Sequence, residues 1–207
     1  SRFSSGHFAD SVEAAMKDKD GRVKVACASN AEPVMFVFKT IIEQHVGELS
    51  LFKVYSGKIT PGNDLLNVNN SKGERLSQLS LLNGRNRKEI SSLSAGDIGA
   101  VVKLKDTHTN DTLASYNYPV IIDKIVFPIA TISGAIIPKA KGDEDKIANG
   151  FNTIHQEDPS FEYKFDPELS QTIISGQGEL QLALAVKRLK DRYGVEVDLV
   201  EPKIPYR

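Results

Sequence analysis

The region from Pro33 to about Asp123 shows the hydrophobic and polar pattern of short β-strands. Residues 34–42 form a run rich in apolar β-formers, and residues 49–57 alternate mostly between apolar and polar positions. Turn-forming residues follow at a spacing of roughly ten residues, at positions 61–64, 71–74, 83–84 and 95–97. Several short strands at this spacing are typical of a closed barrel or a sandwich. We therefore predict an all-β domain in this region.

From about Lys124 the pattern changes to alternating strands and helices. The expected order is strand, helix, strand, strand, helix and strand, over residues 125–137, 143–157, 161–165, 171–175, 178–193 and 195–200. Apolar residues at helical spacing support both helices: Ile147, Phe151 and Ile154 in the first, and Leu182, Val186, Leu189 and Tyr193 in the second. Gly194 is placed to cap the second helix. This order is the split βαβ sandwich, in which two helices cover one face of the sheet and leave the other face for a neighbouring domain or a partner.

The N-terminal residues show no targeting signal. Residues 9–16 favour a short helix, and residues 17–21 read as a charged turn ending in the hairpin dipeptide Asp20-Gly21. No apolar core of a signal peptide is present, and no run approaches the roughly 18 apolar residues of a membrane span. The chain starts at Ser1 rather than at methionine, so we expect either an engineered fragment or an internal piece of a longer protein.

Composition narrows the class of protein further. The 207 residues are 40% hydrophobic and 26% charged, which allows a packed core and argues against global disorder. With 26 basic and 27 acidic residues, the net charge of -1 excludes a generally basic nucleic-acid binder but leaves room for a local basic patch. Cys27 is the single cysteine, so no intramolecular disulfide forms, as expected in a reducing cytoplasm. We interpret Cys27 as a buried or incidental thiol.

Two glycines, Gly176 and Gly178, raise the question of a phosphate-binding loop before the second helix. A Walker-type loop needs Lys-Ser or Lys-Thr after its last glycine, whereas Gly178 is followed by Glu179, whose charge repels phosphate. A dinucleotide loop needs a third glycine, and that position holds Gln181. The glycines are therefore predicted to form a turn between a strand and a helix.

No other pattern indicates chemistry in this chain. Nucleophile and zinc-protease motifs are absent from the sequence, and the histidines His7, His45, His108 and His155 lie far apart. We therefore predict no catalytic residue, no cofactor-binding residue and no metal ligand.

Two basic clusters are candidate contacts to RNA or to a ribosome. Arg85, Arg87 and Lys88 lie in a loop of the β region, and a second group on the last helix comprises Lys187, Arg188, Lys190 and Arg192. Lysine and arginine make sequence-independent contacts to the phosphate backbone. A solvated helix face is the competing interpretation of the same residues.

The C-terminal half resembles a known family. Residues 171–182 (QTIISGQGELQL) resemble the Q-T-I-I-S-G-M-G-E-L-H-L signature of elongation factor G, a translational GTPase. Residues 157–161 (EDPSF) resemble its E-D-P-[ST]-F motif, and residues 137–139 (IPK) resemble its E-P-K motif, with Ile137 in place of the acid. Residues 201–207 (EPKIPYR) resemble the K-P-Q-V-A-Y-R that leads into the fourth domain of the family.

The β region resembles the second domain of the same family. Residues 45–50 (HVGELS) and 54–57 (VYSG) are similar to its H-x-G-x-L-[ST] and R-V-Y-S-G motifs. Residues 95–100 (AGDIGA) and 104–113 (LKDTHTNDTL) match A-G-D-I-G-A and L-K-D-T-x-T-x-D-T-L. The resemblance runs in order from about Pro33 to Arg207.

The resemblance implies two domains followed by absent ones. Residues 31–122 would form a translation-factor β-barrel (domain II) and residues 123–207 an α+β ferredoxin-like βαββαβ sandwich (domain III), with residues 1–30 as a remnant of the linker from the GTPase domain. This chain would be the non-catalytic, ribosome-binding and nucleotide-state-relaying portion of the factor, acting in translocation or ribosome recycling. GTP and magnesium are expected only in the absent nucleotide domain, whose presence would make the parent protein a GTPase. The alternative is a part of a ribosomal-protection or regulatory ribosome-remodelling protein.

The resemblance also implies partners and a site. The expected partners are small-subunit ribosomal RNA and protein, and the nucleotide and downstream domains of the full-length protein, in the cytoplasm and away from membranes. Leu180, Gln181 and Arg188 match positions in or near the interdomain pocket that binds fusidic acid. Gln181 replaces the usual histidine and Gln177 the usual methionine, which puts fusidic acid sensitivity in doubt. Residues 82–89 also differ from the common H-A-N-x-R-x-E form, which suggests a paralogue or factor-G-like branch.

Overall fold

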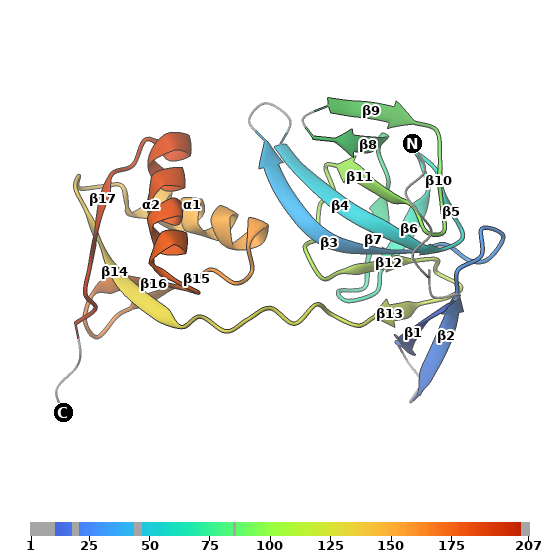
Figure 1. Ribbon diagram of the computed structural model, residues 1–207, viewed down its shortest axis with the longest axis horizontal. Coiled ribbons are helices and arrows are strands. Elements are labelled where there is room, and N and C mark those ends of the chain that lie inside the picture. Colours follow the sequence, from blue (N-terminus) through green and yellow to red (C-terminus); the bar gives the residue numbers. More distant parts are fainter. Residues whose placement is uncertain (1–10, 18–20, 44–46, 85, 204–207) are drawn as a thin grey trace. The chain divides into compact units, whose positions relative to one another are not determined.

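The computed structural model describes residues 11–17, 21–43, 47–84 and 86–203. The chain divides into two compact units, residues 1–125 and 126–207 (Figure 1). The first unit is built from strands, and the second combines strands with the helices α1 and α2. The predicted fold class is therefore confirmed: a β-barrel is followed by an α+β ferredoxin-like sandwich.

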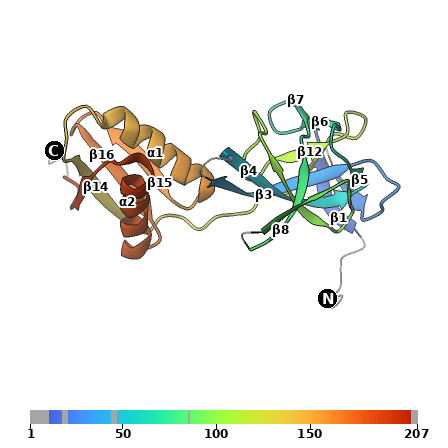
Figure 2. The same ribbon diagram turned by 90° about the horizontal axis from the view of Figure 1, so that it is seen from above.

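An eight-stranded antiparallel sheet forms most of the first unit. Its order is β7-β6-β12-β3-β4-β11-β8-β9, with bounds β3 Val34–Glu43, β4 Gly47–Ser56, β6 Asp64–Asn67, β7 Lys72–Arg75, β8 Leu79–Asn83, β9 Asn86–Ile90, β11 Ile98–Val102 and β12 Thr112–Ala114. The short strands β5 (Lys58–Ile59) and β10 (Leu93–Ser94) pair beside it. Figure 2 shows the sheet curling on itself. The buried core of this unit includes Met35, Phe52, Val54 and Leu113.

A three-stranded sheet extends the first unit, in the order β13-β1-β2. Strand β1 (Ser11–Met16) pairs with β2 (Arg22–Ala26) and with β13 (Val120–Ile122). The expected helix over residues 9–16 is therefore wrong across its described part. Ala14 is fully buried against β13 and β2, so packing across the sheet outweighs the helix propensity of this alanine-containing segment. The described part of the expected linker segment 1–30 thus belongs to the first unit. Cys27, just after β2, is exposed rather than buried.

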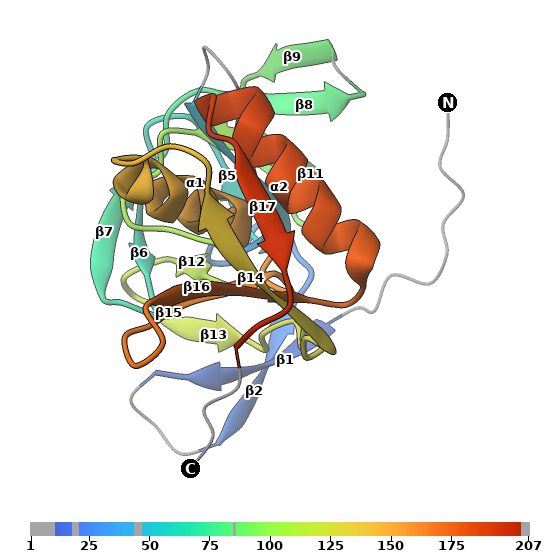
Figure 3. The same cartoon turned by 90° about the vertical axis from the view of Figure 1, so that its left-hand side faces the viewer.

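The second unit is a four-stranded antiparallel sheet with both helices on one face (Figure 3). The strands follow the order β15-β16-β14-β17, and the elements in chain order are β14 Ile132–Pro138, α1 Glu144–Glu157, β15 Glu162–Asp166, β16 Gln171–Gly176, α2 Glu179–Tyr193 and β17 Val197–Val200. This order places the first strand of the unit at the centre, beside the third and the fourth. All six predicted elements are present, but β14 begins at Ile132 rather than at residue 125.

The helices of the second unit bury the predicted apolar faces. Ile147, Phe151 and Ile154 of α1 are buried, as are Leu182 and Leu189 of α2. Tyr163 of β15 packs against the same core, and its ring lies 6.3 Å from that of Phe151. Gly194 ends α2 with a left-handed φ of 67° and donates its N–H to the carbonyl of Lys190, so the predicted cap is confirmed. Neither of the helices in the described residues is long and apolar enough to cross a bilayer.

Candidate functional site

The glycine-containing turn joins a strand to a helix, as predicted. Strand β16 ends at Gly176, and α2 begins at Glu179 after Gly178 in the N-cap position. Gly178 has extended backbone, which any residue can adopt, whereas a Cβ atom at Gly176 would lie 2.5 Å from Oε1 of Gln181. A larger residue at position 176 would therefore have to displace the Gln181 side chain from its present position.

Gln181 connects three backbone segments of the second unit. Its Oε1 accepts a hydrogen bond from the backbone N–H of Gln177 (2.6 Å). Its Nε2 donates to Oδ2 of Asp158 (2.8 Å) and to Oγ of Ser160 (2.9 Å). The side chain thus ties the N-terminus of α2 to the turn that follows α1, with every hydrogen-bonding atom of its amide group in use.

This arrangement lowers the pKa of the Asp158 carboxyl group. Burial alone raises the pKa of Asp158, but hydrogen bonds from Ser160 and Gln181 and the charge of Arg188 outweigh it, so the net pKa is lowered. The Ser160 hydroxyl donates to Oδ1 at 2.6 Å, while Gln181 holds Oδ2. Asp158 is therefore an ionised anchor for the turn rather than a group suited to proton transfer near neutral pH.

Leu180, Gln181 and Arg188 lie near one another on α2, but they do not line one cavity together. A small cavity of about 50 Å³ between the end of α1 and α2 is lined by Gln181 and Arg188, together with Leu184 and Phe161. Leu180 lies outside that lining and is 74% exposed. Leu184, one turn further along, is 44% exposed. The assignment of Leu180, Gln181 and Arg188 to an interdomain pocket stays a prediction.

Glu157 organises the basic residues at the C-terminal end of α2. Its Oε2 lies 2.9 Å from Nη1 of Arg192 and 3.8 Å from Nη1 of Arg188, and its side chain is only 8% exposed. Lys190 pairs instead with Glu196 at 2.8 Å, and this pair raises the pKa of the lysine and lowers that of the glutamate. Four basic residues on α2 were predicted to contact RNA. Three of them, Arg188, Lys190 and Arg192, therefore have anionic partners inside the unit. Lys187 is exposed and has no such partner within the described residues.

Arg87 and Lys88 of the first unit, predicted to lie in a loop, belong to strand β9, because this segment pairs with β8, and they show the same mixture of paired and unpaired cations. Nη2 of Arg87 donates to Oε2 of Glu43 at 3.0 Å, joining β9 to the end of β3. Lys88 is exposed on β9 and has no ion pair in the described part of the chain. Arg85 lies outside the described residues. Contact of these side chains with RNA stays a prediction, for which Lys88 and Lys187 are the cations least committed elsewhere.

The segment that enters the second unit is held by Gln177, a role that the sequence did not reveal. The Gln177 Nε2 donates to the carbonyl oxygens of Pro128 (3.2 Å) and Ile129 (2.6 Å). Thr131 adds two hydrogen bonds, from its N–H to Gly176 and from its hydroxyl to the carbonyl of Gln177. In the sequence, Gln177 differs from the family pattern only in replacing its usual methionine. Its partners lie 48 and 49 residues away, so no local pattern could identify them.

Each of the two units matches a different domain of a known protein family. Residues 32–116 match the family described as Elongation factor G domain 2, and residues 127–201 match Elongation Factor G, domain III. A crystal structure of a protein from Thermus thermophilus is similar over 86% of this chain, with a TM-score of 0.74 and 29% sequence identity. The matched part is 27% of that protein, so the chain spans about a quarter of its length. The chain belongs to the elongation factor G family, of which it comprises domains II and III.

Proposed function

We propose that this chain is the ribosome-binding and nucleotide-state-relaying portion of an elongation factor G-like translational GTPase that acts in translocation, ribosome recycling or both. The observation that carries the proposal is the succession of two domains of this family in one chain, in their family order. The cytoplasm, where ribosomes translate, is the expected location. GTP and magnesium would bind the nucleotide domain of the full-length protein and not these residues.

Electrostatic contact with ribosomal RNA is part of the proposal. Lys88 on β9 and Lys187 on α2 are exposed cations without an ion pair in the described residues, so they are free to approach phosphate. Arg87, Lys190 and Arg192 would have to exchange a carboxylate partner for a phosphate, which lowers the net gain. Lys88 and Lys187 are therefore the two side chains we expect to contribute most to binding.

Relay of the nucleotide state would pass through the turn around Gln181. The hydrogen bonds of this side chain join the start of α2 to Asp158 and Ser160, beside the exposed Leu180. A neighbouring domain that contacts Leu180 and Leu184 would act directly on this hydrogen-bonded group. The arrangement suits a surface that responds to a partner without chemistry of its own.

Co-sedimentation of the 207-residue chain with ribosomes over a range of salt concentrations tests the proposal. We expect binding that weakens with salt, and the double variant Lys88→Gln/Lys187→Gln should reduce the slope of log K against log salt by roughly 0.7–0.9 for each lost phosphate contact. Lys24→Gln, an exposed lysine on β2 without an ion pair in the described residues, is the matched control. Binding that is absent at low salt, or tight magnesium-dependent GTP binding by this chain, would contradict the proposal.

A further inference from the structure

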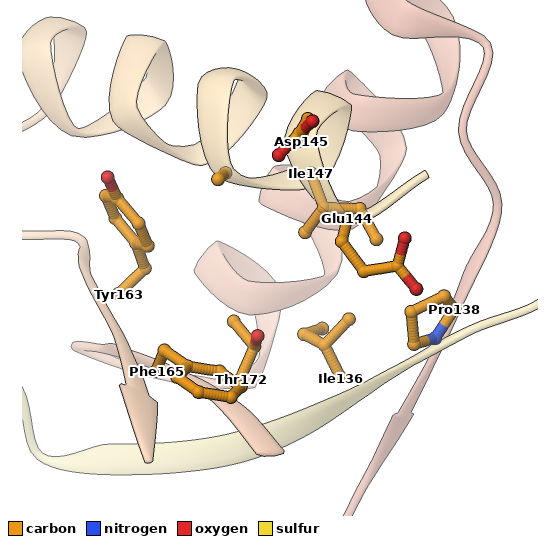
Figure 4. Close-up of a pocket in the computed structure, with 9 residues that line it drawn as sticks. Ile136, Pro138, Glu144, Asp145, Ile147, Tyr163, Phe165 and Thr172 are labelled. Carbon is orange, nitrogen blue, oxygen red and sulfur yellow. The ribbon is translucent and has the colours of Figure 1, made fainter. Parts of the chain in front are cut away.

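A partly open cavity lies in the second unit between the first turns of α1 and the sheet beneath them (Figure 4). Its volume is about 260 Å³. Most of its wall is apolar and comes from Ile136 and Pro138 of β14, Ile147 of α1, and Tyr163 and Phe165 of β15. Figure 4 shows Ile136 and Ile147 on facing walls, so the cavity opens directly onto the hydrophobic core of the unit.

The size of the cavity indicates what it can hold. Sites for small molecules usually enclose about 300–1,000 Å³, and this cavity lies just below the lower end of that range. One large apolar side chain fits the space, as the central residue of an interface fits its pocket. Phe165, 60% exposed beside the cavity, adds apolar surface on which the rest of such an occupant would lie.

The charges around the cavity are negative. Glu144 and Asp145 contribute to its lining from the first turn of α1, where carboxylates interact favourably with the helix dipole. Neither carboxylate has a hydrogen bond or ion pair within the described residues. Lys146 binds Asp143 at 2.9 Å and Lys139 binds Asp198 at 3.1 Å, and the exposed Lys141 is not among the residues that line the cavity. An occupant that brings a positive charge beside its apolar group would therefore match both features.

We propose that this cavity binds a segment of a partner protein that inserts one large apolar side chain, with lysine or arginine beside it facing Glu144 and Asp145. This surface is distinct in its chemistry from the basic clusters expected to contact RNA. The inference does not rest on the proposed function, because binding of a peptide to the chain is measured without ribosomes.

A synthetic peptide, acetyl-Lys-Lys-Phe-Lys-Lys-amide, serves as the probe. Titrated into the 207-residue chain with labelled isoleucine methyl groups, it should shift the signals of Ile136 and Ile147 in a saturable way. Removal of both charges with Glu144→Gln/Asp145→Asn should weaken binding about fivefold, the effect of two exposed ion pairs of ordinary strength. The matched control Glu179→Gln/Asp191→Asn removes one glutamate and one aspartate from the exposed positions of α2 and should leave the affinity unchanged.

A second variant tests the apolar part of the site. Ala148 lines the cavity and is exposed, so Ala148→Phe should fill the space and abolish the methyl shifts, with the thermal unfolding transition confirming that the unit is folded. The peptide in which alanine replaces phenylalanine should fail to saturate the shifts. Equal binding of the two peptides, unchanged affinity in the Glu144→Gln/Asp145→Asn variant, or absence of saturable shifts would each overturn the proposal. Binding of phenethylammonium as tight as that of the peptide would overturn the protein-segment assignment in favour of a small organic cation.

Discussion

Replacement of Gln181 by alanine tests whether the turn between α1 and α2 depends on one side chain. The change removes the acceptor for the Gln177 N–H and the donor to Asp158 and Ser160. A neutral hydrogen bond contributes about 1 kcal/mol and one to a charged group about 1.5–3 kcal/mol. Because Gln181 is only half-buried and water can replace part of these bonds, we expect a loss of about 2 kcal/mol in the free energy of unfolding.

The assay is thermal unfolding followed by helical circular dichroism, since α1 and α2 both belong to the second unit. For a unit of this size, 1 kcal/mol corresponds to about 4–8 °C in Tm, so the expected decrease is about 8–16 °C. Gln156→Ala is the matched control, because Gln156 lies on α1 without a hydrogen bond from its amide within the described residues. That variant should change Tm by less than about 2 °C.

The pH dependence of the same variant gives an independent test. The hydrogen bond from Gln181 helps to lower the pKa of Asp158 in the folded state below the ordinary value of an aspartate. A lowered folded-state pKa stabilises the protein fully above the unfolded-state pKa, and this contribution disappears as the pH falls through the folded-state value. The difference between the original protein and Gln181→Ala should therefore be largest near about pH 7 and shrink below about pH 4. A loss smaller than about 0.5 kcal/mol at neutral pH, or a difference that does not shrink in acid, would refute the reasoning.

Three further predictions concern other parts of the chain. Glu157→Gln should remove the ion pairs of Arg188 and Arg192 and destabilise the second unit by about 1–2 kcal/mol. The two arginines would then be free to contact phosphate, so salt-dependent co-sedimentation with ribosomes should become stronger. Unchanged binding would argue against both arginines as RNA contacts. Glu74→Gln should lower the urea midpoint of the first unit by the equivalent of about 2–3 kcal/mol, because this 4% exposed carboxylate accepts hydrogen bonds from Lys105, Asp106 and Thr107; a loss under about 1 kcal/mol would contradict this role. Gly194→Ala should cost about 1 kcal/mol in thermal unfolding, since φ is 67° there, and Gly194→Asn should cost less.

The second unit was predictable because its signals are local. Helical spacing of apolar residues fixed both helices, and Gly194 marked the end of α2 within the same few residues. The turn between a strand and a helix at Gly176 and Gly178 was likewise predicted from adjacent residues. Each of these inferences compares neighbours in the chain, and each describes what the structure shows.

What the sequence did not reveal depends on residues brought together by folding. Strand β1 owes its conformation to pairing with β13, more than 100 positions further along the chain in residue numbering. Glu157 meets Arg192 across 35 residues, and Gln181 meets Asp158 across 23. The sequence placed Gln181 at a departure from its family, but only the fold shows that the amide there uses both of its polar atoms.

The pairing of Gln171 with Lys203 has a mechanical consequence. The side-chain amide of Gln171, at the start of β16, donates to the carbonyl of Lys203 at 3.2 Å and accepts from its N–H at 3.2 Å. The chain beyond β17 is thus fastened to the strand that leads directly into the turn before α2. A tensile force applied at Lys203 would be shared between β17 and β16. The force would therefore reach the N-terminal end of α2 before the edge strand β17 separates from the sheet.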